Sequence, residues 1–290
     1  MKPPAILHGS SLAYDGLDWA RISEGLDGAI ESWATAGSSP AEWEMLHGRS
    51  PDATCAFIVV SPYDLNEFFL CDFRADIVPL GRTIRDLRKS DLDWQQDKRI
   101  LSQYPRLFAR KLFPTIGRSD GIMVGIRAKF QRLTGMSFAT DAGDAPKFGG
   151  TGKSEVKERI SDWSDARSQR RLALLRVACQ DKQSFNGPKK LALVRLLQRA
   201  ETQGQAVLVV MPVPPLYHHE FLTSAVMREF EEALADVQQL CPQVKVIRLD
   251  QLPGLNKNDL FYDTVHLNMF GQQIATDALV SHLKALGISH

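Results

Sequence analysis

The chain has 290 residues, of which 44% are hydrophobic and 24% charged, and its net charge is +1. This composition is typical of a globular protein with a sizeable core, and the near-zero charge excludes a general electrostatic attraction to nucleic acid. No apolar run approaches the 18 residues that a membrane-spanning helix needs. The opening MKPPAILHG lacks the apolar region of a signal peptide. We therefore expect neither a transmembrane segment nor a signal peptide in this chain.

Strand-like and helical patterns alternate along the chain, which predicts an α/β fold with a mainly parallel sheet. Short apolar runs bounded by turn residues indicate five strands. They are AILH at 5–8, AIESWATAG at 29–37, CAFIVV at 55–60, QAVLVVMPVPP at 205–215 and VKVIRLD at 244–250. The third run is apolar throughout, as expected for a strand that is buried on both faces.

The third and fourth strands are separated by residues 61–204, and about 130 of these, 72–203, exceed a usual connection. Their pattern predicts helices at 91–112, 120–133, 154–179 and 188–203, with a break rich in glycine, aspartate and alanine at 140–154. We interpret residues 72–203 as a helical insertion or cap within one domain that spans residues 1–290.

The final helix is predicted over 271–286, with Ile274, Ala278 and Leu283 facing the core. The four cysteines, Cys55, Cys71, Cys179 and Cys241, have neither zinc-site nor CxxC spacing, so we expect buried free thiols. No carboxylate or cysteine stands at ligand spacing from His218 and His219, and we expect no metal and no cofactor.

Two serines, Ser10 and Ser11, follow the first strand directly. Serines at this position often cap a helix, but the carboxyl ends of strands are also where open α/β sheets bind ligands. Either serine is therefore a candidate nucleophile as well as a candidate cap.

An aspartate and a histidine three residues apart, Asp263 and His266, precede the last helix. In a turn this spacing lets the carboxylate hold one ring nitrogen while the other ring nitrogen faces a nucleophile. That is the arrangement of a Ser-His-Asp triad. The alternative is that Asp263 caps a helix and His266 packs inward.

The segments HGSSLAYDGLD, ATAGSSPAEW, VVSPYDLNE and FYDTVHLN resemble, in this order, the conserved blocks of SGNH/GDSL hydrolases. The resemblance covers about residues 5–70 and 205–286. It is greatest to SGNH proteins that modify cell-surface polysaccharides, the DltD-like proteins and those that acetylate exopolysaccharides. It implies a flavodoxin-like three-layer α/β/α sandwich.

The resemblance assigns Ser11 as the nucleophile, ahead of Ser10, with His266 as the general base and Asp263 as its orienting carboxylate. It implies an oxyanion site made by the backbone N–H groups of Ser11 and Gly37. Asn66 is the candidate for the family's side-chain donor, although Ser61-Pro62-Tyr63-Asp64 lacks the usual glycine.

The predicted function is that of a serine esterase or O-acyltransferase acting on short-chain, acetyl-type esters of a polysaccharide through an acyl-enzyme. Two alternatives stay open. One is a non-catalytic SGNH-fold module that binds a glycan or a membrane-bound acyltransferase, and the other is an intracellular lipase or thioesterase. The resemblance favours an extracytoplasmic location where an upstream anchor is missing from this chain.

Seven basic residues and one acid lie between residues 106 and 132, interleaved with apolar side chains. This pattern is typical either of a solvated helix face or of a surface that contacts an anionic membrane or polymer. The expected partners are thus a polysaccharide or small acyl ester, a membrane-bound acyltransferase and, through 106–132, a membrane surface.

Overall fold

The computed structural model describes residues 5–48, 55–69, 78–105 and 154–288. A five-stranded sheet with all neighbours parallel lies at its centre, in the order β2-β1-β3-β4-β5. The strands are β1 (Ala5–His8), β2 (Ile30–Ser32), β3 (Cys55–Val60), β4 (Gln205–Val210) and β5 (Lys245–Arg248). The predicted α/β fold with a parallel sheet is confirmed. The strand order reverses between β1 and β3, and ligands bind at such a switch point in doubly wound sheets.

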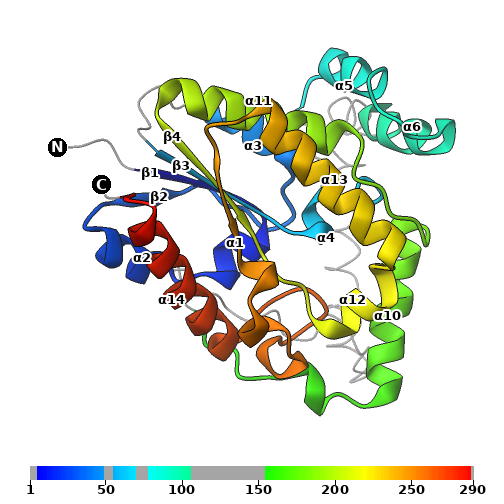
Figure 1. The fold of residues 1–290 in the computed structure, drawn as a ribbon. Helices are drawn as coiled ribbons and strands as arrows, with labels where there is room; N and C mark the ends of the chain where they lie inside the picture. The colour runs from blue at the N-terminus through cyan, green and yellow to red at the C-terminus, as the bar shows by residue number, and fades with distance from the viewer. Residues whose placement is uncertain (1–4, 49–54, 70–77, 106–153, 289–290) are drawn as a thin grey trace, which may run out of the picture.

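Helices cover both faces of the sheet, which makes three layers (Figure 1). On one face α2 (Trp19–Leu26) and α14 (Met269–Ala285) pack beside each other. The other face is covered by α3 (Pro40–His47), α11 (Pro188–Gln203) and α13 (Ser224–Leu240).

The alternation of side chains along the strands explains this division. Phe57, Val59 and Val207 lie in the core with α2 and α14, whereas Ile58, Val60 and Leu208 lie in the core with α3, α11 and α13. Successive strand residues point to opposite faces, so strands β3 and β4 supply apolar side chains to both cores.

A third apolar cluster lies at the carboxyl edge of the sheet, where the site described below is found. It joins α1 (Ser11–Gly16) to α10 (Asp165–Cys179) and α12 (Pro215–Phe221) through Leu12, Leu172 and Tyr217. The remaining helices are α4 (Pro62–Leu65), α5 (Leu80–Leu87) and α6 (Trp94–Leu101). Helix α10 thus brings part of the long segment between β3 and β4 next to the ends of the strands.

The helices of that long segment agree only in part with the sequence patterns. Helix α11 occupies the predicted range and covers the sheet itself, whereas α6 begins at Trp94, three residues after the predicted start, and residues 106–112 of that predicted helix lie outside the described residues. The helix predicted over 154–179 begins only at Asp165, capped by Ser164, because Val156 and Ile160 hydrogen-bond to the backbone of 261–269 instead. The predicted helix at 120–133 lies outside the described residues, and the assignment of 72–203 as an insertion stays a prediction.

The prediction that Ile274 faces the core is wrong. Ile274 is 40% exposed, whereas Ala275, Leu279 and Leu283 are buried at a spacing of four residues. Ala278 is partly buried and packs against the core, as does the fully buried Leu283. In the first turn the sequence pattern therefore assigned burial to Ile274, one residue before the position that is buried, Ala275.

The described cysteines, Cys55, Cys179 and Cys241, are buried free thiols as expected. Burial raises the pKa of the Cys55 thiol to about 12, so it behaves as a small apolar side chain. Among the described residues, no helix is long and apolar enough to cross a membrane.

Candidate active site

The two serines after β1 have different roles. Ser10 is the N-cap of α1, and its hydroxyl accepts a hydrogen bond from the Leu12 N–H at 3.2 Å. Ser11 is the first helical residue, and its Oγ lies 2.7 Å from Nε2 of His266. A Cβ on Gly9 would lie 2.2 Å from the Cβ of Ala13, so glycine lets α1 approach the end of β1 this closely.

The Asp263 side chain stabilises the loop that carries His266 through hydrogen bonds to the backbone and to the imidazole. One carboxylate oxygen of Asp263 accepts the backbone N–H groups of Val265 and His266 at 2.9 and 2.8 Å. Both carboxylate oxygens lie 2.9 Å from Nδ1 of His266. The Tyr262 N–H donates to the His266 carbonyl and closes the loop. Aspartate is suited to this position because its short side chain reaches both the following backbone and the imidazole.

Ser11, His266 and Asp263 therefore form a continuous hydrogen-bonded chain, although 255 residues separate the serine from the histidine. The Tyr262 ring stacks on the imidazole, with 5.5 Å between the ring centroids and 11° between the planes. The carboxylate on Nδ1 and the ring on one face restrict rotation of the imidazole. This leaves Nε2 directed at the serine hydroxyl.

The electrostatics of the pair favour an ion pair between imidazolium and carboxylate. Burial acts to raise the pKa of Asp263, but His266 and the two backbone N–H groups outweigh it and lower that pKa. Burial likewise acts to lower the pKa of His266, but Asp263, then Asp15 and Asp64, outweigh it and raise that pKa. A base with a raised pKa is well placed to accept a proton from serine.

Asp15 and Asp64 were not predicted as site residues. Asp15 stands four residues after Ser11, and that spacing along a helix was the signal for a shared face. Asp64 accepts a hydrogen bond from the hydroxyl of Ser61, which follows β3 and caps α4. Both carboxyls act electrostatically on His266, so acidic residues from three separate segments raise the pKa of one imidazole.

An open hollow of about 460 Å³ lies over the serine and the histidine. Its lining comes from α1, from the loop after β2 and from the histidine loop: Ser11, Tyr14, Asp15, Ala34, Thr35, Ala36, Tyr262 and His266. The N–H of Thr35 and the hydroxyl of Ser38 both bond to the Gly9 carbonyl, which ties the β2 loop to the serine turn. Small side chains on this wall leave room for an acyl group beside Ser11.

The two predicted oxyanion donors outside α1, Gly37 and Asn66, lie in different surroundings. Gly37 follows the lining residues Thr35 and Ala36 in an exposed turn, with φ of 70°, a left-handed conformation that glycine adopts without strain. The Asn66 side chain is fully buried and donates to the side chain of Gln183 at 2.6 Å. Its oxygen accepts from the backbone of Phe68 and Ser184. Asn66 thus holds neighbouring loops together and is not among the residues that line the hollow.

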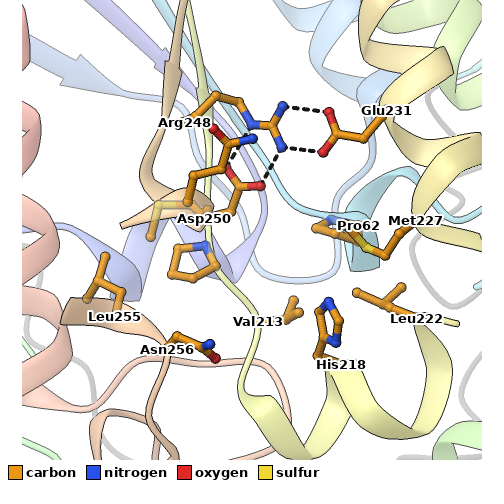
Figure 2. A pocket seen from close by; sticks show the side chains of 13 residues that line it. Pro62, Val213, His218, Leu222, Met227, Glu231, Arg248, Asp250, Leu255 and Asn256 are labelled. Carbon is orange, nitrogen blue, oxygen red and sulfur yellow. Dashed lines mark hydrogen bonds and ion pairs between the residues drawn. The ribbon is translucent and has the colours of Figure 1, made fainter. Parts of the chain in front are cut away.

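A second hollow of about 230 Å³ lies by the ends of β4 and β5 (Figure 2). Its most polar wall carries Arg248, which makes two hydrogen bonds to Glu231 and two to Asp250. His218 lies away from that group, whereas Met227 lies beside Pro62, one turn of α13 before Glu231 (Figure 2). Because the guanidinium is already paired with two carboxylates and no serine lines this hollow, it lacks the chemistry of the first one.

Two other sequence predictions concern metal binding and the basic segment at 106–132. Among the described residues, no three histidine, cysteine or acidic side chains are grouped so as to hold a metal ion. The basic segment at 106–132 lies outside the described residues. Its contact with a membrane or polymer stays a prediction.

No family model matches this chain, and no curated protein matches it. Among solved structures, it is similar to "a possible lipase from Chitinophaga pinensis DSM 2588". That match has 10% sequence identity and a TM-score of 0.38, and it covers 99% of this chain and all of the other chain. A likeness of this size carries no argument about activity.

Proposed function

We propose that this protein is a serine-dependent esterase or O-acyltransferase. The observation that carries the proposal is the chain of hydrogen bonds from Ser11 through His266 to Asp263, at 2.7 and 2.9 Å, beside an open hollow. Serine needs an adjacent base to become a useful nucleophile, and the base needs a third group to orient it. The site supplies both.

In the first half-reaction the Ser11 hydroxyl attacks the ester carbon while Nε2 of His266 takes its proton. Asp263 accepts a hydrogen bond from Nδ1 and stabilises the resulting imidazolium. The backbone N–H of Ser11 is free of an intrahelical partner at the start of α1, so it donates to the oxyanion. The imidazolium then protonates the departing alcohol, which leaves an acyl-Ser11 enzyme.

In the second half-reaction an acceptor hydroxyl attacks the acyl carbon while His266 takes its proton; the acyl–Oγ bond then breaks, and the imidazolium returns the proton to Ser11. Water as the acceptor gives hydrolysis, and a sugar hydroxyl gives transfer. Short acyl groups of the acetyl type suit the wall of Ala34, Thr35 and Ala36. A polysaccharide as the alcohol portion, and an SGNH-type enzyme, are proposals that rest on the sequence resemblance.

The test is the release of p-nitrophenol from p-nitrophenyl acetate by wild type, Ser11→Ala, His266→Ala and Ser10→Ala. We expect Ser11→Ala and His266→Ala to lose activity by about 10³-fold or more. Ser10→Ala is the matched control, since it removes the same hydroxyl one residue earlier and should keep near-normal activity.

Covalent labelling by a fluorophosphonate separates the remaining possibilities. A transferase that excludes water would label at Ser11 without releasing p-nitrophenol. A non-catalytic glycan-binding module would neither label nor hydrolyse, and that result would contradict the proposed function.

A further inference from the structure

Asp15 is a carboxyl group in the candidate active site that raises the pKa of His266 but has no assigned contact with the substrate. It lies one helical turn after Ser11 on α1, so the two Cβ atoms are about 5–6 Å apart on one face. Both residues line the same hollow. The Asp15 carbonyl accepts a hydrogen bond of 2.7 Å from the Gln272 side chain, which fixes this turn of α1 to α14.

The Asp15 side chain is buried without a full set of hydrogen-bond partners. Asp15 is only 4% exposed, and its Oδ1 has no hydrogen-bond partner among the described residues. Buried carboxyl oxygens are nearly always hydrogen-bonded in folded proteins. Asp15 lines the hollow, and its carboxyl group has hydrogen-bonding capacity that no described residue uses, so a group on the substrate can serve as its partner.

The charged groups around Asp15 indicate what that partner is. Burial raises the pKa of Asp15 to about 6, with His266 acting to lower it and Asp263 acting to raise it. The carboxyl group therefore changes protonation close to neutral pH. A hydroxyl group suits both forms, because it donates to a carboxylate and accepts from a carboxylic acid.

An ammonium group suits the position less well. It can only donate, and it would lie near the imidazolium that forms on His266 during each acyl transfer. Two positive charges in this largely buried site repel each other and would raise the barrier. The hydroxyl of a polyol carries no such penalty.

We propose that Asp15 binds a hydroxyl group on the alcohol portion of the ester, next to the esterified oxygen, and so selects esters of polyols and sugars. This inference rests on the proposed esterase or acyltransferase function. It assigns to Asp15 the recognition of the substrate, beside its electrostatic effect on His266.

The test compares two esters that differ by one hydroxyl group, 2-hydroxyethyl acetate and ethyl acetate, with wild type, Asp15→Ala and Asp15→Asn. We expect Asp15→Ala to reduce kcat/KM for 2-hydroxyethyl acetate about 10-fold more than for ethyl acetate. Asp15→Asn should fall between wild type and Asp15→Ala, because its amide still forms hydrogen bonds. Each variant is its own folding control, since misfolding lowers both rates equally.

Equal losses on the two esters would overturn the proposal and leave Asp15 acting only through His266. Binding of the same esters to Ser11→Ala, measured by saturation-transfer NMR, gives an answer that does not need turnover. Tighter binding of 2-hydroxyethyl acetate, abolished by adding Asp15→Ala, would support the proposal even in an enzyme that excludes water. Equal binding of both esters, or binding of neither, would contradict it. Failure of the proposed function is recognised separately, by a wild type that neither hydrolyses p-nitrophenyl acetate nor labels with a fluorophosphonate.

Discussion

His8 and His266 are two histidines of the same sheet edge whose pKa values shift in opposite directions. His8 ends β1, only three residues before Ser11, and is fully buried against His47, with 3.0 Å between their ring nitrogens. Burial, with a smaller effect of His47, lowers the pKa of His8 to about 3. Burial also acts to lower the pKa of His266, yet that pKa is raised.

The difference between the two lies in the carboxyl groups around them. The pKa of His266 is raised by Asp263, Asp15 and Asp64, whereas the side chain that bonds to His8 is another imidazole. A neutral imidazole pair does not stabilise a positive charge, so His8 and His47 serve packing. The comparison teaches that burial alone makes a histidine inert, and that nearby acids make it a base.

The largest expected effect comes from making His266 resemble His8. Asp263→Asn keeps the shape of the side chain but removes the charge and the acceptor that fix the imidazole tautomer. We expect kcat for p-nitrophenyl acetate to fall about 10²–10⁴-fold. NMR titration should show the pKa of His266 falling.

Asp259→Asn is the matched control, because it is the same change at an exposed aspartate four residues earlier. Its activity should be unchanged. An Asp263→Asn enzyme as active as this control would show that the carboxylate has no part in catalysis.

The second prediction concerns the pH dependence of stability at the His8–His47 pair. The folded-state pKa of His8 is lowered from 6.5 to about 3. Between these pH values His8 is protonated in the unfolded chain but neutral in the folded protein. The stability gained by keeping His8 neutral in the folded state is fully present above pH 6.5 and is lost as the pH falls toward 3. Between pH 7 and pH 5 the free energy of unfolding should fall by about 2 kcal/mol from His8 alone.

Urea unfolding of wild type and His8→Gln at pH 7 and pH 5 isolates this effect. Glutamine can still donate to His47 but does not titrate, so the variant should lose less stability on acidification. The raised pKa of His266 works in the opposite direction, with its stabilising contribution lost as the pH rises through that pKa. It cancels because both proteins retain His266. Equal losses in the two proteins would show that His8 is not a buried neutral histidine.

A smaller effect is expected at Ser10, which distinguishes the cap from the nucleophile. Ser10→Ala removes the hydroxyl that caps α1 and should lower the free energy of unfolding by about 1 kcal/mol. Ser10→Thr, which keeps a capping hydroxyl, should recover most of this loss. A large loss of esterase activity in Ser10→Ala at full folding would reverse the assignment of the two serines.

The sheet could be predicted from the sequence because buried parallel strands such as 55–60 and 205–210 are continuous apolar runs. The Ser11 and Asp263–His266 segments could be found because their motifs are short and local. Asn66 could not be placed, since its partners at Gln183 and Ser184 come from more than 100 residues away. Local spacing contains no information about such contacts.

Residues 154–164 show the same limit. Their pattern is compatible with a helix, but hydrogen bonds to the histidine loop hold Val156 and Ile160 in a different conformation. Asp15 and Asp64 were missed for a related reason. Their importance comes from their electrostatic effect on an imidazole from a distant segment. For Asp15 the only local signal was its four-residue spacing from Ser11, and for Asp64 there was none.

The smallest expected effect tests how much each of the three acids, Asp263, Asp15 and Asp64, contributes to the raised pKa of His266. Asp263 contributes most to the raised pKa of His266, then Asp15, and then Asp64. Because the base must be neutral to accept a proton, kcat/KM falls as the pH drops below this pKa. Removing any of the three charges should move that acidic limb to lower pH.

Asp64→Asn should therefore shift the limb in the same direction as Asp15→Asn, but by less, with the plateau rate at high pH nearly unchanged. The cap of α4 is the backbone N–H of residue 64 donating to the Ser61 hydroxyl, so it should survive this substitution, and the amide oxygen can still accept from Ser61. The measurement is kcat/KM for p-nitrophenyl acetate between pH 5 and pH 9. A shift to higher pH would mean that Asp64 does not act on His266 as a negative charge, and the raised pKa would then depend on Asp263 and Asp15 alone.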